Sequence, residues 1–487
     1  MSSSEIASCS SLPSVFSRRS LVKAGVLGLS GGGLLSLDQL LAHQGAHGTG
    51  TARSVLLIFL SGGLSQLDSF DMKPEGPVDI RGEFRPIATQ TPGMQICEHF
   101  PRLAQQTDKL ALVRSLSHWS NEHNEAHTIM LTGRSELPPG YNAKKPQATD
   151  WPCLTSVAGR LLPPKESGLP TAVTLPQRLI NMNQGGVVTP GQFGGQMGVQ
   201  HDPWFVEASP YRGNDVKGAY PDFAYSRRLE EKVKDSTQFR APVLSLPEGL
   251  TTKRMQRRNQ MLQVIDRGRQ SLESPQTKQL DRHRQGAISL LTAPEVRHAF
   301  DVTQADSKVA DRYGRNLFGW TLLMARRLLA AGVPVIQANL GNYNTWDLHG
   351  GIFRLSRDLL YPPADQAVSA LLSDLAETGE LQETMVVIAG EFGRTPRIFK
   401  VPGAYKSPGR DHWGPVHTAV FAGAGVPGGT IIGASDEMGA YPSENPFTPE
   451  DFATTIYHTL GIRDDAVWLD TTERPSPVFK GQPIFGK

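Results

Sequence analysis

The chain of 487 residues is long enough for one large domain or two domains of ordinary size. Its formal net charge of +2 and its 20% of charged residues lack the basic excess that a nucleic-acid or membrane-surface partner would require. The 49 glycines and 36 prolines indicate many loops, which is typical of a large α/β enzyme with insertions.

Residues 1–42 resemble a twin-arginine export signal. The stretch SRRSLVKAG contains the adjacent Arg18 and Arg19, and a weakly apolar, glycine-rich run follows it. That run includes Asp38 and is too polar for a stable membrane span, although a frayed N-terminal helix is an alternative interpretation. We expect the mature protein to be periplasmic or otherwise exported by this route, with no stable membrane span after the signal is removed. The route carries folded proteins, often with a cofactor inserted, so the signal also suggests a bound metal.

Only two of the three cysteines, Cys97 and Cys153, lie outside this signal. Export permits a disulfide between them, but the sequence does not show whether they are close. Two thiols are too few for a cysteine-rich metal site.

The mature chain begins with an apolar run at 53–63, which predicts a strand covered on both faces by helices. A second short strand is expected around 110–113, followed by a helix through Met130 and Leu131. Residues from about 135 to 315 are loop-rich and then charged and helical in pattern, so they form a predicted insertion. The basic run at 253–258 favours a solvated helix face over a nucleic-acid patch, because acids and apolar residues interleave nearby.

The C-terminal part alternates between predicted strands and helices. We expect strands at 333–340, 384–393 and 417–426, and helices at 364–380 and 448–462. This order predicts an α/β fold, an open and mostly parallel sheet with helices on both faces. A single domain of this kind would span about 53–470.

Carboxylates and imidazoles follow several of these strands, where parallel sheets place their sites. They are Asp68, Asp71, His118, His123, His127, Asp347, His349, Glu391, Asp411 and His412. Mixed oxygen and nitrogen ligands suit zinc, manganese or similar divalent ions, with calcium also considered. One or two ions are expected, and two ions ~4 Å apart could clamp a phosphate or sulfate ester.

Each motif also has a simpler explanation. Asp347 and His349 in WDLHGG can form a turn with a helix cap, and Glu391 can merely pair with Arg394. The GRDHWG motif around Asp411 can be a surface turn. Independent loops have no structural reason to place such residues at strand exits together, so the shared placement favours a site.

Seven motifs together resemble a known family: GGLSQLDSFDMKP, IRGEFRPIAT, ICEHFPRLA, MLTGR, WDLHGG, GEFGRTPRI and GRDHWG. The order of elements is similar to that of the alkaline phosphatase/sulfatase superfamily. The motifs resemble one exported bacterial branch of it, known as domain of unknown function 1501, from Arg53 to Ile462. The resemblance implies an alkaline phosphatase-like fold with a helical, loop-rich insertion.

The resemblance can be carried over residue by residue. Sulfatases place their nucleophile in Cys-x-Pro-Ser-Arg-x-x-x-Leu-Thr-Gly-Arg, and the LTGR of this chain ends at Arg134. This alignment puts His123 at the modified cysteine and His127 at the arginine. Glu391 keeps the acid of a later metal-binding pair, and His412 matches a late histidine.

The alignment also shows a departure from the family at the first strand. The paired aspartates that normally end this strand fall at Ser61 and Gly62. Asp68 and Asp71, further along the loop, are the candidates to replace them.

Two functions remain open at this stage. In the first, the chain is a metal-dependent hydrolase of a small anionic phosphate or sulfate ester, or of a sulfated or phosphorylated polymer. Metal-bound water would attack the ester, or His123 would attack it or act as a general acid. The other expected catalytic residues are His127, Arg134 and Arg394, with Arg410 as a further anion-binding candidate. The expected ligands come from Asp68, Asp347, His349, Glu391, Asp411 and His412.

In the second function, the fold is kept as a non-catalytic exported binding or scaffold protein. The absence of Ser, Thr or Cys at His123 favours this alternative, whereas the cluster of histidines and acids favours the hydrolase.

Overall fold

The computed structural model describes residues 50–163, 169–210, 215–240, 254, 257, 261 and 298–486. The predicted export signal at 1–42 lies outside these residues. Most of the basic run at 253–258 also lies outside them, although its Arg254 and Arg257 are helical and exposed. The described residues belong to one compact unit, Gly45–Lys487.

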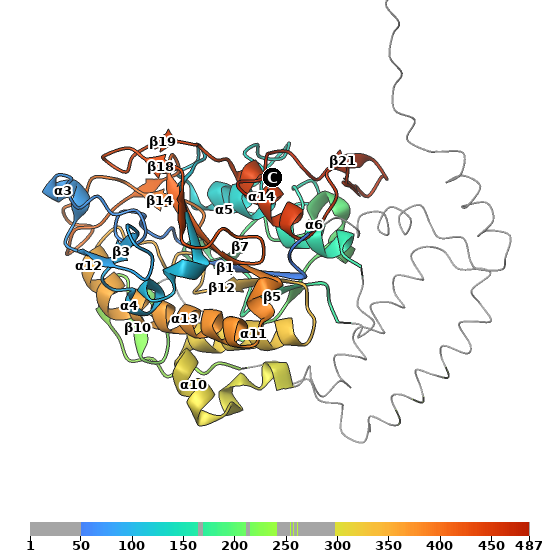
Figure 1. The fold of residues 1–487 in the computed structure, drawn as a ribbon, viewed down its shortest axis with the longest axis horizontal. Coiled ribbons are helices and arrows are strands. Elements are labelled where there is room, and N and C mark those ends of the chain that lie inside the picture. Colours follow the sequence, from blue (N-terminus) through green and yellow to red (C-terminus); the bar gives the residue numbers. More distant parts are fainter. Residues whose placement is uncertain are drawn as a thin grey trace, which may run out of the picture. The chain divides into compact units, whose positions relative to one another are not determined.

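An eight-stranded, mostly parallel sheet forms the centre of this unit (Figure 1). The strand order is β17-β4-β16-β13-β1-β12-β5-β8. Their bounds are β1 Ser54–Phe59, β4 Leu110–Leu116, β5 Ala172–Leu175, β8 Trp204–Phe205, β12 Val335–Asn339, β13 Thr384–Ala389, β16 His417–Gly423 and β17 Thr430–Ile432. Only β16 runs against its neighbours β13 and β4, so the start of β16 lies at the edge where the parallel strands end.

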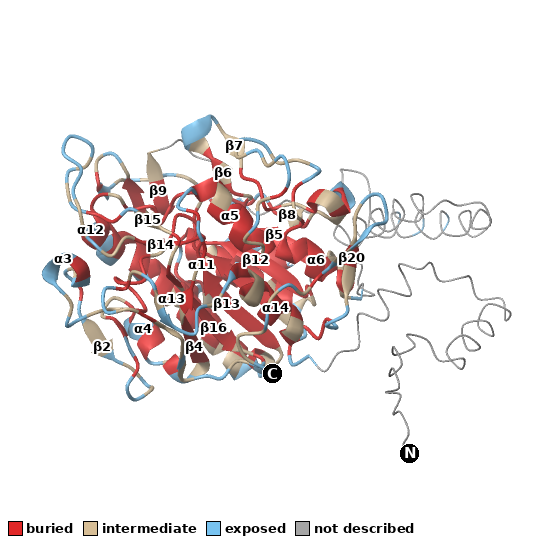
Figure 2. Ribbon diagram, turned by 90° about the horizontal axis from the view of Figure 1, so that it is seen from above, coloured by how far each residue is buried: buried red, intermediate tan, exposed pale blue. Residues whose placement is uncertain are grey.

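The predicted strands agree with the observed ones to within a few residues at each end. The predicted run at 53–63 contains β1, whose side chains alternate between two hydrophobic cores. Leu56 and Ile58 belong to one core, and Val55 and Leu57 belong to the other. A strand with apolar residues on both faces must be covered on both sides. Figure 2 shows the central strands buried.

Helices cover both faces of the sheet, as the sequence predicts. The core on one face includes residues of α11 (Leu317–Ala330) and α13 (Tyr361–Glu377). The core on the other face includes residues of α5 (His123–Thr132), α6 (Leu154–Leu161) and α14 (Pro449–Thr459). The fold is therefore α/β with helices on both faces.

Two helix starts show how local sequence sets these elements. Helix α14 begins with the predicted cap, because the side chain of Thr448 accepts from Asp451 N and the side chain of Asp451 accepts in return from Thr448 N. Helix α13 begins at Tyr361, three residues before the predicted start. It directly continues a π-helical turn at Ser356–Leu360, so the hydrogen-bonding pattern changes just before Pro362 and Pro363, which have no N–H to donate.

The predicted insertion consists of short elements. A three-stranded antiparallel sheet combines β9 (Val216–Ala219), β10 (Phe223–Ser226) and β11 (Glu231–Lys232), and α10 (Ser307–Tyr313) follows. Packing continues past 470, since Val478 is buried. Cys97 and Cys153 are both free and buried.

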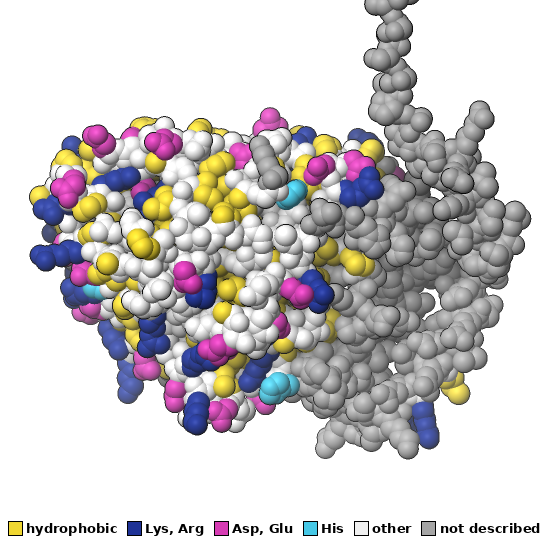
Figure 3. All heavy atoms as spheres, viewed as in Figure 1, with side chains coloured by type: hydrophobic (Ala, Val, Ile, Leu, Met, Phe, Trp, Pro, Cys, Tyr) yellow, Lys and Arg dark blue, Asp and Glu magenta, His cyan; other side chains and the backbone are white. Residues whose placement is uncertain are grey.

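The surface carries charges of both signs. Figure 3 shows lysine and arginine side chains interspersed with aspartate and glutamate on the face in view, in keeping with a net charge of +2. Among the described residues, no helix combines the length and apolar character needed to cross a membrane.

Candidate metal centre

Histidines and carboxylates from separate strand ends meet at one edge of the sheet. Asp347 follows β12, Glu391 follows β13, and His123 is the first residue of α5 after β4. His412 lies in the short strand β15 (His412–Trp413) just before β16. Because β16 is antiparallel, the segment that enters it reaches the edge at which β12 and β13 end. The topology therefore explains why residues almost 300 positions apart lie together.

The outer part of this cluster is centred on Asp347. His349 Nε2 lies 2.8 Å and His412 Nε2 lies 3.1 Å from Asp347 Oδ1. The two Nε2 atoms are 3.0 Å from each other. His123 Nε2 lies 3.4 Å from Asp347 Oδ2. Three imidazoles thus direct the same ring nitrogen toward one carboxylate.

The inner part of the cluster is centred on Glu391, which is fully buried. Its Oε1 lies 2.7 Å from His123 Nδ1 and 3.5 Å from His127 Nε2. The backbone N–H of Gly62 donates to both carboxylate oxygens, at 2.8 and 3.0 Å. The hydroxyl of Ser61 lies 2.8 Å from His127 Nε2. The end of β1 therefore positions the inner cluster through hydrogen bonds.

The second nitrogen of each outer histidine has an oxygen nearby. His123 Nδ1 faces Glu391, and His412 Nδ1 lies 2.8 Å from the carbonyl oxygen of Asn121. His349 Nδ1 lies 3.4 Å from Asp411 Oδ1. Metal-binding histidines are usually held in this way, because an acceptor at one nitrogen keeps the proton there and leaves the other nitrogen free as a ligand.

The spacing of these atoms also fits a metal ion. Ligand atoms ~2.0–2.1 Å from a tetrahedral zinc ion lie roughly 3.3 Å from one another. The distances from the Asp347 carboxylate to the three imidazoles, and between the imidazoles of His349 and His412, are 2.8 to 3.4 Å. Three overlapping groups have ligand atoms within 4.8 Å of one another: His123, Asp347 and His412; His123, His127 and Glu391; and His349, Asp411 and His412. His123 Nε2 is buried without a hydrogen-bond partner, as expected of a ligand atom.

Two arginines flank Asp347. Arg394 Nη2 donates to Oδ1 at 2.7 Å and Arg227 Nη1 donates to Oδ2 at 3.2 Å. Burial alone would raise the pKa of Asp347, but Arg394 and His123 outweigh it and hold this pKa well below its usual range. Arg394 is buried, whereas the side chain of Arg227 is 30% exposed. Arg394 therefore fixes Asp347 in place, and Arg227 faces the side open to solvent.

The histidines differ in their tendency to hold a proton. Burial opposes the charged form of His123, but Asp347 and Glu391 outweigh burial and raise its pKa to about 9. Burial dominates for His127 and for His412, and lowers each pKa to about 4. His127 and His412 are therefore neutral near pH 7, which is the form that binds a metal, whereas His123 holds a proton that a bound ion would have to displace.

Asp68 lies apart from the cluster, which corrects its prediction as a ligand. Its carboxylate accepts from Arg410 Nε at 2.7 Å and Nη2 at 3.0 Å, and both side chains are fully buried. Ser65 Oγ donates to the same carboxylate at 2.6 Å. Asp71 instead pairs with Lys73 and Arg114. The loop after β1 therefore uses its acids to hold neighbouring segments, and Arg410 is engaged in the same buried pair.

Arg134 also lies away from the cluster, which corrects its prediction as a catalytic residue. His123 is the first residue of α5, and Arg134 follows the last residue, Thr132. Ten helical residues span ~15 Å, so the two side chains lie at opposite ends of the helix. Among the other predicted residues, His118 is buried, with Nε2 2.5 Å from the carbonyl oxygen of Glu391. Asp411 is 54% exposed.

Three residues near the cluster were not predicted as site residues. Arg227 follows β10 in the loop-rich insertion, where no periodic pattern marks it. Tyr343 packs against the imidazoles of both His123 and His127, with its ring centroid 5.2 Å from each. Phe392 packs 5.0 Å from His123 and 4.7 Å from His412. Phe392 thus restrains two imidazoles. The only sequence signal for this role is an apolar residue directly after Glu391, at the end of a predicted strand.

Comparisons with known proteins give one strong match. No curated protein matches the chain. A solved structure of Ps i-CgsB in complex with k-i-k-neocarrahexaose is 12% identical, with 84% of this chain and 72% of that chain covered and a TM-score of 0.36. The phosphonate monoester hydrolase SpPMH from Silicibacter pomeroyi is 13% identical, with 85% and 74% covered and a TM-score of 0.36. The TAB5 alkaline phosphatase is 12% identical, with 78% and 94% covered and a TM-score of 0.31. A family model described as "Protein of unknown function (DUF1501)" matches residues 52–484.

Proposed function

The chain belongs to the family of proteins of unknown function DUF1501, and from that premise we propose that it is an exported, metal-dependent hydrolase of phosphate or sulfate esters. The observation that carries the proposal is the convergence of His123, His349 and His412 on Asp347, with Arg227 on the open side. Export through the twin-arginine route is part of the same proposal.

We assign the ion to the outer cluster, with Asp347, His123, His349 and His412 as its ligands. The inner group of His127 and Glu391 is the place for a second ion. A donor set dominated by imidazole favours zinc or manganese over calcium, which takes oxygen ligands. When bound, the ion supplies Lewis acidity that polarises an ester oxygen and lowers the pKa of water.

The chain's own side chains have separate tasks in this proposal. Arg227 neutralises the anionic ester, because its guanidinium is partly exposed and already lies beside Asp347. Arg394 holds Asp347 in position from the buried side. His349 and His412, with side chains 16% and 18% exposed, form the surface that the substrate meets.

Water, and not His123, is the nucleophile that we propose. An imidazole that attacks phosphorus needs a free ring nitrogen facing the substrate. His123 Nδ1 is held by Glu391, and its Nε2 is buried and faces Asp347. His123 therefore holds the ion and does not form a covalent intermediate.

A binding or scaffold protein is the second candidate function. The observation that favours it is His123 itself, which occupies the start of α5 in place of a hydroxyl or thiol nucleophile. Under this alternative the ion is structural, and the cluster holds the ends of β12, β13 and β16 together without turnover.

Elemental analysis and turnover assays on the exported protein test both candidates. We expect at least one zinc or manganese ion per chain, and release of nitrophenol from a nitrophenyl phosphate or sulfate. Asp347→Asn should lose both the ion and the turnover, whereas the control His458→Ala, in α14, should keep both. An ion that is retained without turnover of either ester would favour the binding protein, and a metal-free wild type would refute the metal centre.

A further inference from the structure

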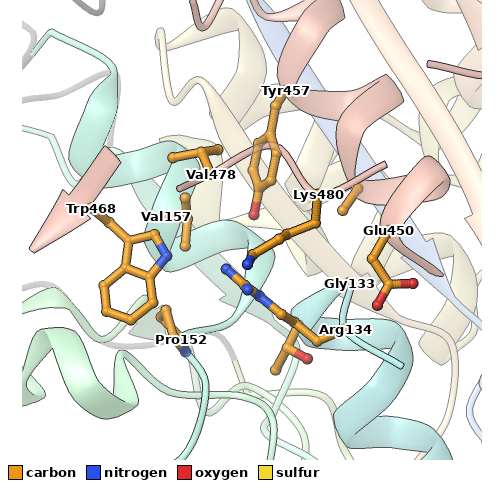
Figure 4. Close-up of a pocket in the computed structure, with 11 residues that line it drawn as sticks. Gly133, Arg134, Pro152, Val157, Glu450, Tyr457, Trp468, Val478 and Lys480 are labelled. Carbon is orange, nitrogen blue, oxygen red and sulfur yellow. The ribbon is translucent and has the colours of Figure 1, made fainter. Parts of the chain in front are cut away.

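A pocket lies at the C-terminal end of α5, away from the metal cluster (Figure 4). It is narrow and opens to solvent at its mouth. Its lining combines residues from the end of α5, from α6 and the turn before it, from α14, and from the segment around β20 (Val467–Leu469) and β21 (Pro475–Pro477). Figure 4 shows Arg134, Lys480 and the hydroxyl of Tyr457 directed into the same space.

The pocket contains a buried hydrogen-bond donor that lacks an acceptor. Trp468 is 2% exposed, and its indole Nε1 is buried without a hydrogen-bond partner. A buried N–H without an acceptor costs about 1–3 kcal/mol, so an unpaired donor that lines a pocket indicates a missing acceptor. Figure 4 shows this nitrogen on the side of the indole that faces Arg134.

Two cations accompany this donor. Arg134 Nη2 donates to the carbonyl oxygen of Pro477 at 3.1 Å, and its guanidinium lies 5.3 Å from the ring centroid of Trp151. These contacts orient a planar group with several donors. Lys480 adds a second positive charge at the exposed rim.

One acid lines the pocket, and its oxygens are already engaged. Glu450 Oε1 accepts from the backbone N–H of Ser135 at 2.6 Å, and Oε2 accepts from the hydroxyl of Ser135 at 2.7 Å. The carboxylate is therefore held against Ser135 at the end of α5. With two cations and one engaged acid, the pocket keeps an excess of positive charge.

We propose that this pocket binds a small oxyanion, a sulfate or phosphate group. Such a group offers several acceptor oxygens on one compact centre, which matches a guanidinium, an ammonium and an indole N–H around a narrow space. The site is separate from the metal centre, because α5, with its ten residues, spans ~15 Å between them. The proposal does not rest on the hydrolase function.

Titration of the exported protein with sodium sulfate and with sodium phosphate tests the proposal. Tryptophan fluorescence should change saturably, because Trp468 and Trp151 lie at the site, and sodium chloride at equal ionic strength should not reproduce the change. Lys480→Gln and Arg134→Gln should each weaken binding about tenfold or more, since each removes a charge-assisted contact. Trp468→Phe removes the indole N–H and should also weaken binding, which is then measured by calorimetry because the variant lacks one of the two reporting tryptophans.

The controls separate this site from the metal centre and from general charge effects. Lys308→Gln removes an exposed lysine on α10, and Asp347→Asn alters the metal cluster; neither should change the affinity of the pocket. Equal affinity in wild type and Lys480→Gln, or no saturation up to about 50 mM of either ion, would overturn the proposal. A sulfated oligosaccharide that competes with sulfate would place the bound group on a polymer, and failure to compete would identify the free ion; both outcomes require the pocket.

Discussion

Asp68→Asn is expected to destabilise the fold and to leave the metal centre filled. Arg410 donates through Nε and Nη2 to the two oxygens of Asp68, and both side chains are fully buried. Asparagine keeps one acceptor oxygen but removes the negative charge. Arg410 would then remain in the core with carbonyl partners only, including Ile80 O at 2.7 Å and Thr395 O at 3.2 Å.

The size of the effect follows from the burial of this pair. Removing one partner of a buried ion pair costs about 3–5 kcal/mol, because an uncompensated charge is left in the interior. Because several backbone carbonyls still accept from Arg410, the expected loss of unfolding free energy is at the lower end of this range, about 3 kcal/mol. The family match covers residues 52–484, and unfolding entropy is about 2.1 cal/mol/K per residue. The melting temperature should therefore fall by only about 3 °C, so chemical denaturation is the more sensitive assay.

Denaturant midpoints and metal content, measured on the same preparations, decide the role of Asp68. We expect Asp68→Asn to unfold at lower denaturant with wild-type metal content, and Asp347→Asn to lose metal. Asp464→Asn, at an exposed aspartate, controls for the change of charge. If Asp68→Asn loses the ion while its midpoint stays at the wild-type value, Asp68 is a ligand and its assignment to a structural pair is wrong.

Three further predictions concern the metal centre, the fold and export. His349→Ala should weaken zinc binding at least about tenfold in competition with a chelating dye, and unchanged affinity would remove His349 from the centre. Burial raises the pKa of Asp365 to about 6, above the unfolded value of about 3.9. The protonated carboxyl therefore contributes its full stability to the fold below about pH 4, and this stability is lost as pH rises through 6. Urea unfolding should show Asp365→Asn gaining on wild type by up to about 3 kcal/mol between pH 4 and 7, and a constant difference would contradict this. Changing Arg18 and Arg19 together to lysine should stop export in a fractionation assay, and a variant that is still exported would show that another route recognises the segment.

The central strands could be predicted because their signal is local. Apolar runs mark β1, β12, β13 and β16, and each run is long enough to show burial on both faces. The edge strands β8 and β17 have two and three residues, and β5 beside β8 has four, too few to carry a periodic pattern. Their positions depend on pairing with distant strands, which the local sequence does not record.

The sequence predicts the site residues that lie beside recognisable strands, and it does not predict those that long loops bring to the site. Glu391 and His412 lie next to strands that the sequence marks, so their meeting follows from the sheet. Asp347 comes eight residues after the end of β12, so its place also depends on contacts such as the ion pair with Arg394. Asp68 comes nine residues after the end of β1, and the path of such a loop is set by contacts with remote residues, here Arg410. Arg227 arrives from an insertion without periodicity, so only the folded structure shows that it contacts Asp347.

The aspartate missing at Gly62, after the end of β1, has a steric cause in this chain. Gly62 has a φ of 117°, a conformation that favours glycine, and a Cβ there would lie 2.5 Å from Trp346 N and 2.6 Å from Asp347 N. No aspartate fits at this position, because the segment carrying Asp347 occupies the space. The same glycine donates its N–H to both oxygens of Glu391. The exit of β1 thus contributes close packing and a donor, and Asp347 and Glu391, which follow the two neighbouring strands, supply the carboxylates.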